Sequence, residues 1–186
     1  MIIYYINLDH REDRKKQIEK ELEHFDCDKV RISAYKGGAL GCTLSQIKAL
    51  MLFIESGHDE CIIFEDDFMF VRDTKDFEFP NESWDVVMLS SNVMKSVPHS
   101  DKFEKVIDAQ TLSGYAVHKN FAKTLLENFK ESYELFRKSK YPPLHAVDMY
   151  CKKLQPTSNW FVCSPKFGIQ RPSWSDIESM YVNYGV

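Results

Sequence analysis

The chain has 186 residues, which is enough for one domain with a substantial core and too few for two comfortable ones. Its net charge of -4 and its pI of about 5.9 argue against a general nucleic-acid-binding protein. An acid-rich site that holds a cation would still accept a phosphate-bearing ligand, so such ligands are not excluded.

The N-terminus and the cysteines indicate a cytoplasmic protein. Residues 1–6 lack the basic start of a signal peptide, and no apolar run approaches the ~20 residues that a transmembrane segment needs. The cysteines are odd in number, widely spaced and without a CxxC pair, which is typical of free thiols in a reducing compartment. The five are Cys27, Cys42, Cys61, Cys151 and Cys163.

The first predicted strand runs from Ile2 to Leu8, because this stretch is β-branched and aromatic. Asp9 is expected to cap the helix that follows, with Glu12 as its capping-box partner. Arg11 and Arg14 lie in the first turn of that helix and would face the strand ends. A strand-turn-helix opening of this kind is a common nucleotide-binding edge. A solvated helix surface is the alternative for both arginines.

A second short strand is predicted from Val30 to Ala34, followed by a turn-rich loop from Lys36 to Gly41. Thr43 to Gln46 has the pattern of a capping box, which would open a second helix. Gly57 is then expected to end that helix in a left-handed conformation. The strand from Cys61 to Phe64 comes next.

Three adjacent carboxylates, Glu65, Asp66 and Asp67, follow this third strand. The continuous apolar run before them is typical of a strand that is buried on both faces of a parallel sheet. The carboxyl end of such a strand is where ligands bind in open α/β sheets. Because adjacent acids repel one another, the sequence suggests a divalent cation such as Mg²⁺ or Mn²⁺. The alternative is a solvated acidic turn.

The second half of the chain continues the pattern with a buried strand from Trp84 to Ser90. Residues 91–105 have weak periodicity and are predicted to form a mobile loop. A further strand covers Ser113 to His118, in which Gly114 would let a ligand or backbone approach closely. Asn120 is expected to cap a long helix.

A Pro-Pro pair at 142–143 ends that helix, and another is expected to begin near Ala146. Trp160 to Cys163 is predicted as the last strand, followed by an irregular tail that ends near the active face. Strands that alternate with helices predict an α/β fold with a mostly parallel central sheet flanked by helices.

Several of these stretches, taken together and in order, resemble the family 25 glycosyltransferases, the group of lipooligosaccharide and collagen galactosyltransferases. The resemblance covers nearly the whole chain, although each motif alone is weak. The chain differs from the family pattern at Gln46, where histidine is usual, and in a short segment between Ala34 and Gly41. The matching stretches are Ile6 to Arg14, Gly41 to Ser45, Ile63 to Asp67, Trp84 to Leu89, Gly114 to Val117, Val147 to Met149 and Gln170 to Ile177.

The resemblance implies one Rossmann-like domain of the GT-A type over residues 1–186. Its first half, to about residue 90, would bind a nucleotide sugar, and residues 91–186 would bind the acceptor. It also implies a divalent metal, usually Mn²⁺, that bridges the diphosphate and an acidic motif, and inversion at the anomeric carbon. The expected donor is UDP-galactose or UDP-glucose, and the acceptor is a hydroxyl group on a glycan or protein.

On this basis we predict Asp67 as the direct metal ligand, with Glu65 and Asp176 as further candidate ligands. A plain helix cap is the alternative for Asp176. Asp148 is the predicted catalytic base, because it is a lone acid in an apolar setting where burial would raise its pKa. The alternative for Asp148 is an acid that interacts favourably with a helix dipole. Candidate nucleotide-sugar contacts are Asn7, Leu8, Arg11, Arg14, Ser33, Ala34, Glu65, Asp66, Gly114 and Tyr115.

Two other functions fit the same residues. One is a non-catalytic module that keeps the fold and binds a nucleotide sugar. The other is a Mg²⁺-dependent phosphoesterase built on the same acidic strand end. Such enzymes usually bring more acids and histidines together in a two-metal site than this chain offers.

Overall fold

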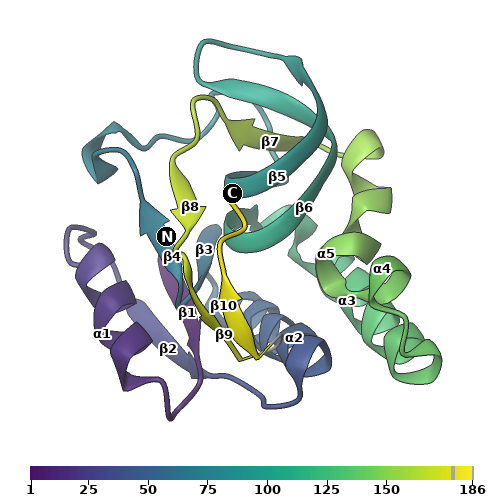
Figure 1. Cartoon of the computed structure of the whole chain (residues 1–186). Coiled ribbons are helices and arrows are strands. Elements are labelled where there is room, and N and C mark those ends of the chain that lie inside the picture. Colours follow the sequence, from purple (N-terminus) through teal and green to yellow (C-terminus); the bar gives the residue numbers. More distant parts are fainter. Residues whose placement is uncertain (177–178, 186) are drawn as a thin grey trace.

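A six-stranded sheet organises the chain in the computed structural model, which describes residues 1–176 and 179–185 (Figure 1). Ile177, the last residue of the tail motif, lies outside the described residues. Across the sheet, the strands are β2 (Lys29–Ser33), β1 (Ile2–Asn7), β3 (Glu60–Glu65), β6 (Phe103–His118), β5 (Val86–Pro98) and β7 (Trp160–Cys163).

The sheet is mostly parallel, as the sequence predicted. β1 pairs in parallel with both β2 and β3, and β5 pairs in parallel with β7. Of these six strands only β6 runs the opposite way, between β3 and β5. The carboxyl ends of β1, β2 and β3 therefore lie side by side, with Asn7 opposite Ser33 and Ile6 opposite Glu65.

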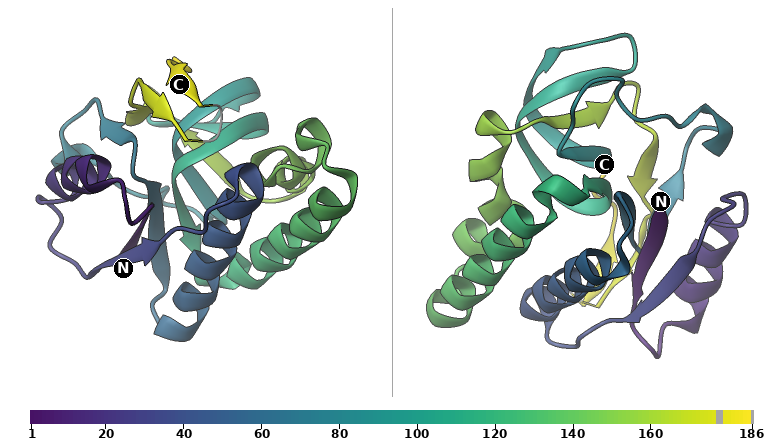
Figure 2. Two further views of the ribbon diagram at one scale, coloured as in Figure 1. Left: turned by 60° about the horizontal axis from the view of Figure 1, so that its bottom comes forward. Right: turned by 180° about the vertical axis from the view of Figure 1, so that it is seen from behind.

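Helices cover both faces of the sheet and bury a core on each (Figure 2). Alternate residues of a strand point to opposite faces. In β3, Cys61 and Ile63 accordingly join the core under α2 and α3, whereas Ile62 and Phe64 join the core under α1. The helices are α1 (Glu12–Glu21), α2 (Gly38–Ser56), α3 (Lys119–Ser139), α4 (Pro142–His145) and α5 (Val147–Tyr150), with 3₁₀ segments η1 (Thr74–Asp76) and η2 (Cys151–Thr157).

The prediction of a mobile loop at residues 91–105 is wrong. β5 continues to Pro98 and β6 begins at Phe103, so the two form a long antiparallel hairpin. The pairing between the strands shifts register at several places along the hairpin. Such irregularities break the strict alternation by which a strand is recognised in a sequence.

Three predicted helix caps are also wrong. Asp9 does not cap α1; its carboxylate accepts hydrogen bonds from Arg31 and Ser33. The expected capping box at Thr43 to Gln46 lies inside α2, which begins five residues earlier, at Gly38. His118, not Asn120, caps α3.

Gly57 does end α2 in the left-handed conformation that the sequence predicted, with φ of 75°. A glycine adopts this conformation without the steric cost that a Cβ brings, which is why it is so common just past a helix end.

The tail after β7 is not irregular but folds back over the acidic strand end. It contains the short strands β8 (Gly168–Gln170), β9 (Ser173–Ser175) and β10 (Met180–Val182). β8 pairs with β4 (Phe68–Phe70), the strand that follows the acids. The Phe68 ring fits against Gly114 and Gly168, where an added Cβ would lie 2.4 Å and 2.1 Å from its atoms.

By length and composition alone, α2 could cross a membrane. Its apolar face packs on the sheet and on α3, which accounts for that composition within this fold. All five cysteines are free, as expected; Cys61, Cys151 and Cys163 are buried. A cytoplasmic location stays a prediction.

Candidate functional site

A cavity of about 380 Å³ lies at the carboxyl ends of β1, β2 and β3. This is a usual size and place for a small-molecule site in an α/β protein. Leu8 and Ala34 contribute to its walls, and the three acids after β3 line it as well. Residues of the tail complete the cavity, so the predicted position of the tail near this face is confirmed.

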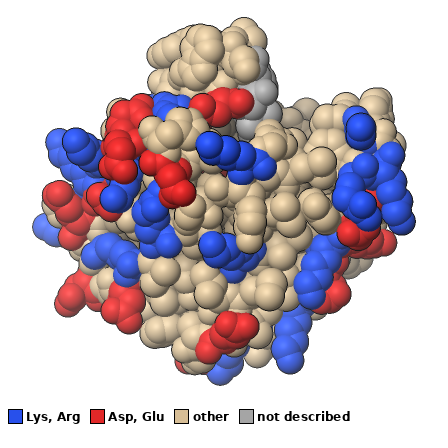
Figure 3. Space-filling model, turned by 90° about the horizontal axis from the view of Figure 1, so that it is seen from below, with Lys and Arg blue, Asp and Glu red and all other residues tan. Residues whose placement is uncertain are grey.

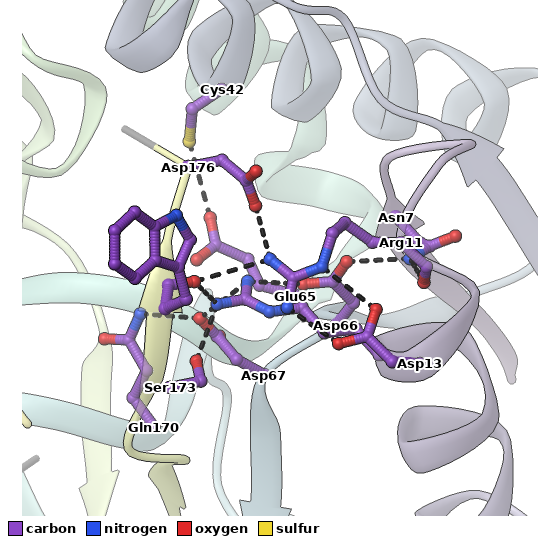
Figure 4. Close-up of polar contacts among 12 residues, drawn as sticks. Asn7, Arg11, Asp13, Cys42, Glu65, Asp66, Asp67, Gln170, Ser173 and Asp176 are labelled. Atoms are coloured by element: carbon purple, nitrogen blue, oxygen red, sulfur yellow. Dashed lines mark hydrogen bonds and ion pairs between the residues drawn. The ribbon is translucent and has the colours of Figure 1, made fainter. Parts of the chain in front are cut away.

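Asp66 is held by groups from the α1 side of the sheet (Figure 4). Its Oδ1 accepts a hydrogen bond from Arg14 at 3.0 Å, and its Oδ2 accepts one from Asn7 at 2.8 Å. Arg14 and Asp66 are both nearly buried. Burial raises the pKa of Asp66, while the Arg14 charge and these hydrogen bonds act against the rise.

Arg14 is fixed from two directions. Its Nη1 reaches Asp66 and also Asp67, whose Oδ2 lies 3.3 Å away. Its Nη2 donates to the Ser173 hydroxyl at 2.6 Å and to the Trp174 carbonyl at 2.7 Å. The guanidinium therefore joins the acidic strand end to β9 and carries the compensating charge for two buried carboxylates.

Only one of the two carboxylate oxygens of Asp67 has hydrogen-bond partners within the described residues. Its Oδ2 accepts hydrogen bonds from Arg14 and, at 3.1 Å, from Gln170. Its Oδ1 is buried and has no hydrogen-bond partner among the residues that the structure describes. Burial raises the pKa of Asp67, and the nearby charge of Asp66 adds to the rise. An unpaired buried carboxylate oxygen costs free energy unless a ligand or ion meets it.

Glu65 lies on the opposite side and has neutral partners. Its Oε1 accepts from the Gln46 amide at 3.2 Å and from the Cys42 thiol at 3.4 Å, both on α2. The Tyr115 hydroxyl donates to Gln46 Oε1 at 2.7 Å, which turns the amide nitrogen toward Glu65. Burial and repulsion from Asp67 raise the pKa of Glu65 to about 8.

Strand alternation explains why Glu65 and Asp66 separate. Glu65 is the last residue of β3 and has the parity of Cys61 and Ile63, which face α2. Asp66 therefore turns to the α1 side. The same alternation predicts Asp67 on the side of Glu65, but β3 ends at Glu65 and a turn follows, so Asp67 also reaches Arg14.

The other predicted polar residues at this edge are engaged within the protein. Asn7 Oδ1 accepts hydrogen bonds from Arg31, in addition to the bond that Asn7 donates to Asp66. The Ser33 hydroxyl donates to Asp9 at 2.9 Å. Arg11 and Asp176 form an ion pair at 2.5 Å that ties α1 to the tail.

Gly114, Tyr115 and Asp148 do not line this cavity. Gly114 packs under Phe68, and Tyr115 is fully buried with its hydroxyl on Gln46. The Asp148 carboxylate is half-buried and accepts a hydrogen bond from the Thr111 amide at 3.3 Å. The proposed roles of these three residues stay predictions.

Sequence reasoning missed several residues that line the cavity. Gly37 and Gly38, with φ of 121° and 61°, form the sharp entry into α2 and were visible only as a turn signal. Gln46, noted as the end of a capping box and as a departure from a family pattern, donates a hydrogen bond to Glu65. The tail residues lie 100 or more positions from the acids, so no local pattern shows which of them reach the cavity, although Gln170 and Ser175 fall within a stretch that matches the family. The missed lining residues are Ile6, His10, Tyr35, Lys36, Gly37, Gly38, Cys42, Ser45, Gln170, Ser175, Val182 and Tyr184.

The lining carries more negative than positive charge. It includes the carboxylates of Glu65, Asp66, Asp67 and Asp176, against Arg14 and Lys36. The face of the protein seen from below carries basic and acidic side chains intermixed (Figure 3), whereas the cavity lining has this excess of acids. A bound cation would relieve it and would lower the raised carboxyl pKa values.

The residues fit a divalent cation that is bound jointly with a diphosphate. Asp67 Oδ1 offers an unpaired buried oxygen, and Glu65 lines the same cavity. Within residues 1–176 and 179–185, no three His, Cys, Asp or Glu side chains are grouped to hold a metal by themselves. Mg²⁺ commonly uses one or two carboxylates together with substrate phosphates, and carboxylates suit Mn²⁺ equally.

Comparison with solved structures shows the fold. The chain is similar to a glycosyltransferase involved in glycosylation of the major capsid of PBCV-1, with a TM-score of 0.55, 9% identity, and coverage of 87% of this chain and 80% of that one. It is also similar to A197 from STIV, with a TM-score of 0.51, 13% identity, and coverage of 91% and 93%. No family model matches the sequence, and no curated protein matches it.

Proposed function

We propose that the chain is a metal-dependent glycosyltransferase that moves a hexose from a nucleotide sugar to a hydroxyl group on a glycan or protein. One observation carries the proposal. An acidic cluster, in which Asp67 Oδ1 lacks a hydrogen-bond partner within the described residues, lines a ligand-sized cavity at the carboxyl ends of three parallel strands. The fold shared with the PBCV-1 glycosyltransferase supports it.

Asp67 and Glu65 are the residues that would hold Mn²⁺ or Mg²⁺, which acts as a Lewis acid toward the leaving diphosphate when bound. Arg14 keeps Asp66 and one oxygen of Asp67 in place. Lys36 lies at the same cavity and supplies a positive charge for the phosphates. Asp176 is the weaker candidate ligand, since Arg11 already pairs with it.

Leu8 and Ala34 form an apolar wall of the cavity, against which the base or ribose of the nucleotide would pack. Asn7, Ser33 and Arg11 would act mainly by shaping this edge, because their polar groups already bond within the protein. Gly114 and Tyr115 would act from beneath, through Phe68 and Gln46.

Asp148 is our candidate for the base that accepts the acceptor hydroxyl proton, which a single inverting displacement requires. The carboxylate is half-buried and fixed by the Thr111 amide. It is also close enough to the cavity-lining Cys42 to help raise the pKa of that thiol, after burial and Glu65. A base at Asp148 would require the acceptor hydroxyl to bind beside α5 (Val147–Tyr150).

The resemblance to family 25 supports UDP-galactose or UDP-glucose as the donor. Gln46 replaces the usual histidine, but its amide donates to Glu65 and so keeps a hydrogen-bond donor at that position.

A binding module without catalysis is the second candidate, and one observation favours it. Arg14 already supplies an internal cation between Asp66 and Asp67. Such a site could bind a nucleotide sugar with less need for a metal.

Titration calorimetry with UDP, UDP-galactose and UDP-glucose, in Mn²⁺ and in EDTA, tests the proposal. We expect binding that Mn²⁺ strengthens and that Asp67→Ala reduces to the level seen in EDTA. Asp101→Ala, an exposed acid in the β5–β6 turn, is the matched control and should bind normally. Absence of UDP binding by the wild-type chain would refute the proposal.

Asp148→Asn separates transfer from binding. The variant should bind the donor normally and lose hexose transfer to acceptor or to water, measured as UDP release. Weakened donor binding would show that Asp148 belongs to the donor site. Normal donor binding by the wild type with no UDP release would favour the non-catalytic module.

A further inference from the structure

A second cavity, of about 640 Å³, lies between α1 and the segment that follows β4. Gln17, Lys20 and His24 border it from α1 and the turn that follows, and the segment from Phe70 to Lys75 borders it from the opposite side. Arg171 contributes from the tail. α1 and β4, which flank this cavity, lie next to each other at the same side of the molecule (Figure 1).

The cavity is basic on a protein that is acidic overall. Lys20, Arg72, Lys75 and Arg171 line it, and Glu21 and Asp73 are the acids among the lining residues. The formal balance of these six groups is therefore +2, whereas the whole chain carries -4. Three segments far apart in the sequence supply the cations, so the charge does not come from a single basic run.

The two arginines are held in place. Arg171 Nη2 pairs with Glu21 at 2.7 Å, and the Arg171 backbone amide donates to the Asp67 carbonyl at 2.6 Å. The Arg72 guanidinium lies over the Phe167 ring, 5.0 Å from its centroid, and donates to the Pro165 carbonyl. A guanidinium fixed in this way loses little conformational freedom when it meets an anion.

The acids have other partners, and the lysines do not. Glu21 bonds to Arg171 and to the Phe70 amide, and Asp73 accepts from the Lys75 amide. The ammonium groups of Lys20 and Lys75 form no ion pair or hydrogen bond within the described part of the chain. Neither lysine is neutralised by a partner within the described residues, so both charges are available to a ligand in the cavity.

We propose that this cavity binds the phosphate group of a small soluble ligand. A phosphate monoester carries a charge near -2 at neutral pH and three acceptor oxygens, which match the local balance of charge and donors. The two cavities share no lining residue, so this proposal does not rest on the proposed glycosyltransferase function.

The test uses inorganic phosphate and pyrophosphate as probes on the full chain, with amide chemical shifts recorded in an NMR titration. We expect the shifts to cluster at residues 70–75 and around Lys20, and the affinity to fall as salt is added. Lys20→Ala and Lys75→Ala, both exposed and without a partner, should each weaken binding by roughly fivefold to tenfold.

Two control variants locate the binding. Lys123→Ala, an exposed lysine on α3, should leave the affinity unchanged. Lys36→Ala removes the lysine of the other cavity, where a diphosphate is proposed to bind, and it should not change the affinity that is read from the shifts at residues 70–75. If Lys36→Ala weakens binding and the variants at Lys20 and Lys75 do not, the phosphate occupies the first cavity and the proposal is wrong.

A lipid headgroup is the other source of the same chemistry. Cosedimentation with vesicles that contain phosphatidic acid distinguishes it. Vesicle binding without any response to soluble phosphate or pyrophosphate would overturn the proposal, as would no response to any probe.

Discussion

Glu65 and Asp66 are adjacent carboxylates, but the side chains that stabilise them differ in charge. Asp66 faces α1, where Arg14 offers a full positive charge and Asn7 a further hydrogen bond. Glu65 faces α2, where its partners are the neutral Gln46 amide and the Cys42 thiol. One step along a strand thus moves a side chain from a charged environment to a neutral one.

The difference teaches which acid is free to respond to a ligand. Asp66 is committed to Arg14, and removing either would leave a buried charge. Glu65 has no cationic partner among the described residues, and burial raises its pKa to about 8, so at neutral pH its carboxyl group is mostly protonated. Binding of a metal at this side would therefore release a proton.

The largest expected effect comes from removing the charged partner. Arg14→Leu leaves Asp66 and Asp67 buried without their cation and should lower the free energy of unfolding by about 3–5 kcal/mol in urea denaturation. The loss should be smaller at pH 4 than at pH 8, because both carboxyl groups can then take up protons.

Arg137→Leu is the matched control for this change. It removes an exposed ion pair with Glu134 on α3 and should cost less than about 1 kcal/mol. Equal losses for Arg14→Leu and Arg137→Leu would show that Arg14 does not carry the charge balance of the cluster.

The second-largest effect is expected at Glu65, whose hydrogen-bond partners are neutral. Folded Glu65 holds its proton to about pH 8 and unfolded Glu65 only to about 4.5, so the folded state binds more protons between these values. Stability of the metal-free protein should therefore fall as the pH rises from 4.5 to 8. Glu65→Gln should make the loss in the free energy of unfolding between pH 4.5 and 8 smaller by a few kcal/mol, measured by urea denaturation in EDTA. An unchanged pH profile would mean that Glu65 ionises normally.

The smallest effect is expected at the neutral partner itself. Gln46→Leu removes the acceptor of the Tyr115 hydroxyl and a donor to Glu65, and should cost about 1–3 kcal/mol. Tyr115→Phe in the same background should cost less than it does alone, because its partner is already missing. Strictly additive losses in this double-mutant cycle would contradict the network.

The sequence predicted the parts of the fold that local pattern controls. The run Ile62 to Phe64 is apolar at every position because β3 is covered on both faces, and that pattern correctly placed the acids at a strand end. Arg14 was predicted to face that end, and it does. The left-handed end of α2 followed from Gly57 alone.

Pairings between distant segments could not be predicted. Residues 91–105 have the sequence pattern of a loop, but they are ordered by the pairing of β5 with β6. Register shifts in this pairing hide the apolar-polar alternation that marks a strand. Ser173 and Gln170 bond to Arg14 and Asp67 across more than 100 positions. The predicted cap at Asp9 failed for a related reason, since its carboxylate bonds to Ser33 on β2. Thr43 lies inside α2, where its hydroxyl donates to the Ala39 carbonyl one turn earlier.

The packing of the Phe68 ring limits which mutations the acidic cluster can tolerate. The ring lies against two glycines, Gly114 on β6 and Gly168 on β8, and neither has room for a methyl group. A Gly168→Ala change would push the ring and, through one peptide unit, the Asp67 carboxylate. Variation at these two positions is thus constrained by the geometry of a neighbouring acid as much as by packing, and a conservative substitution there would displace the acidic cluster while leaving the protein folded.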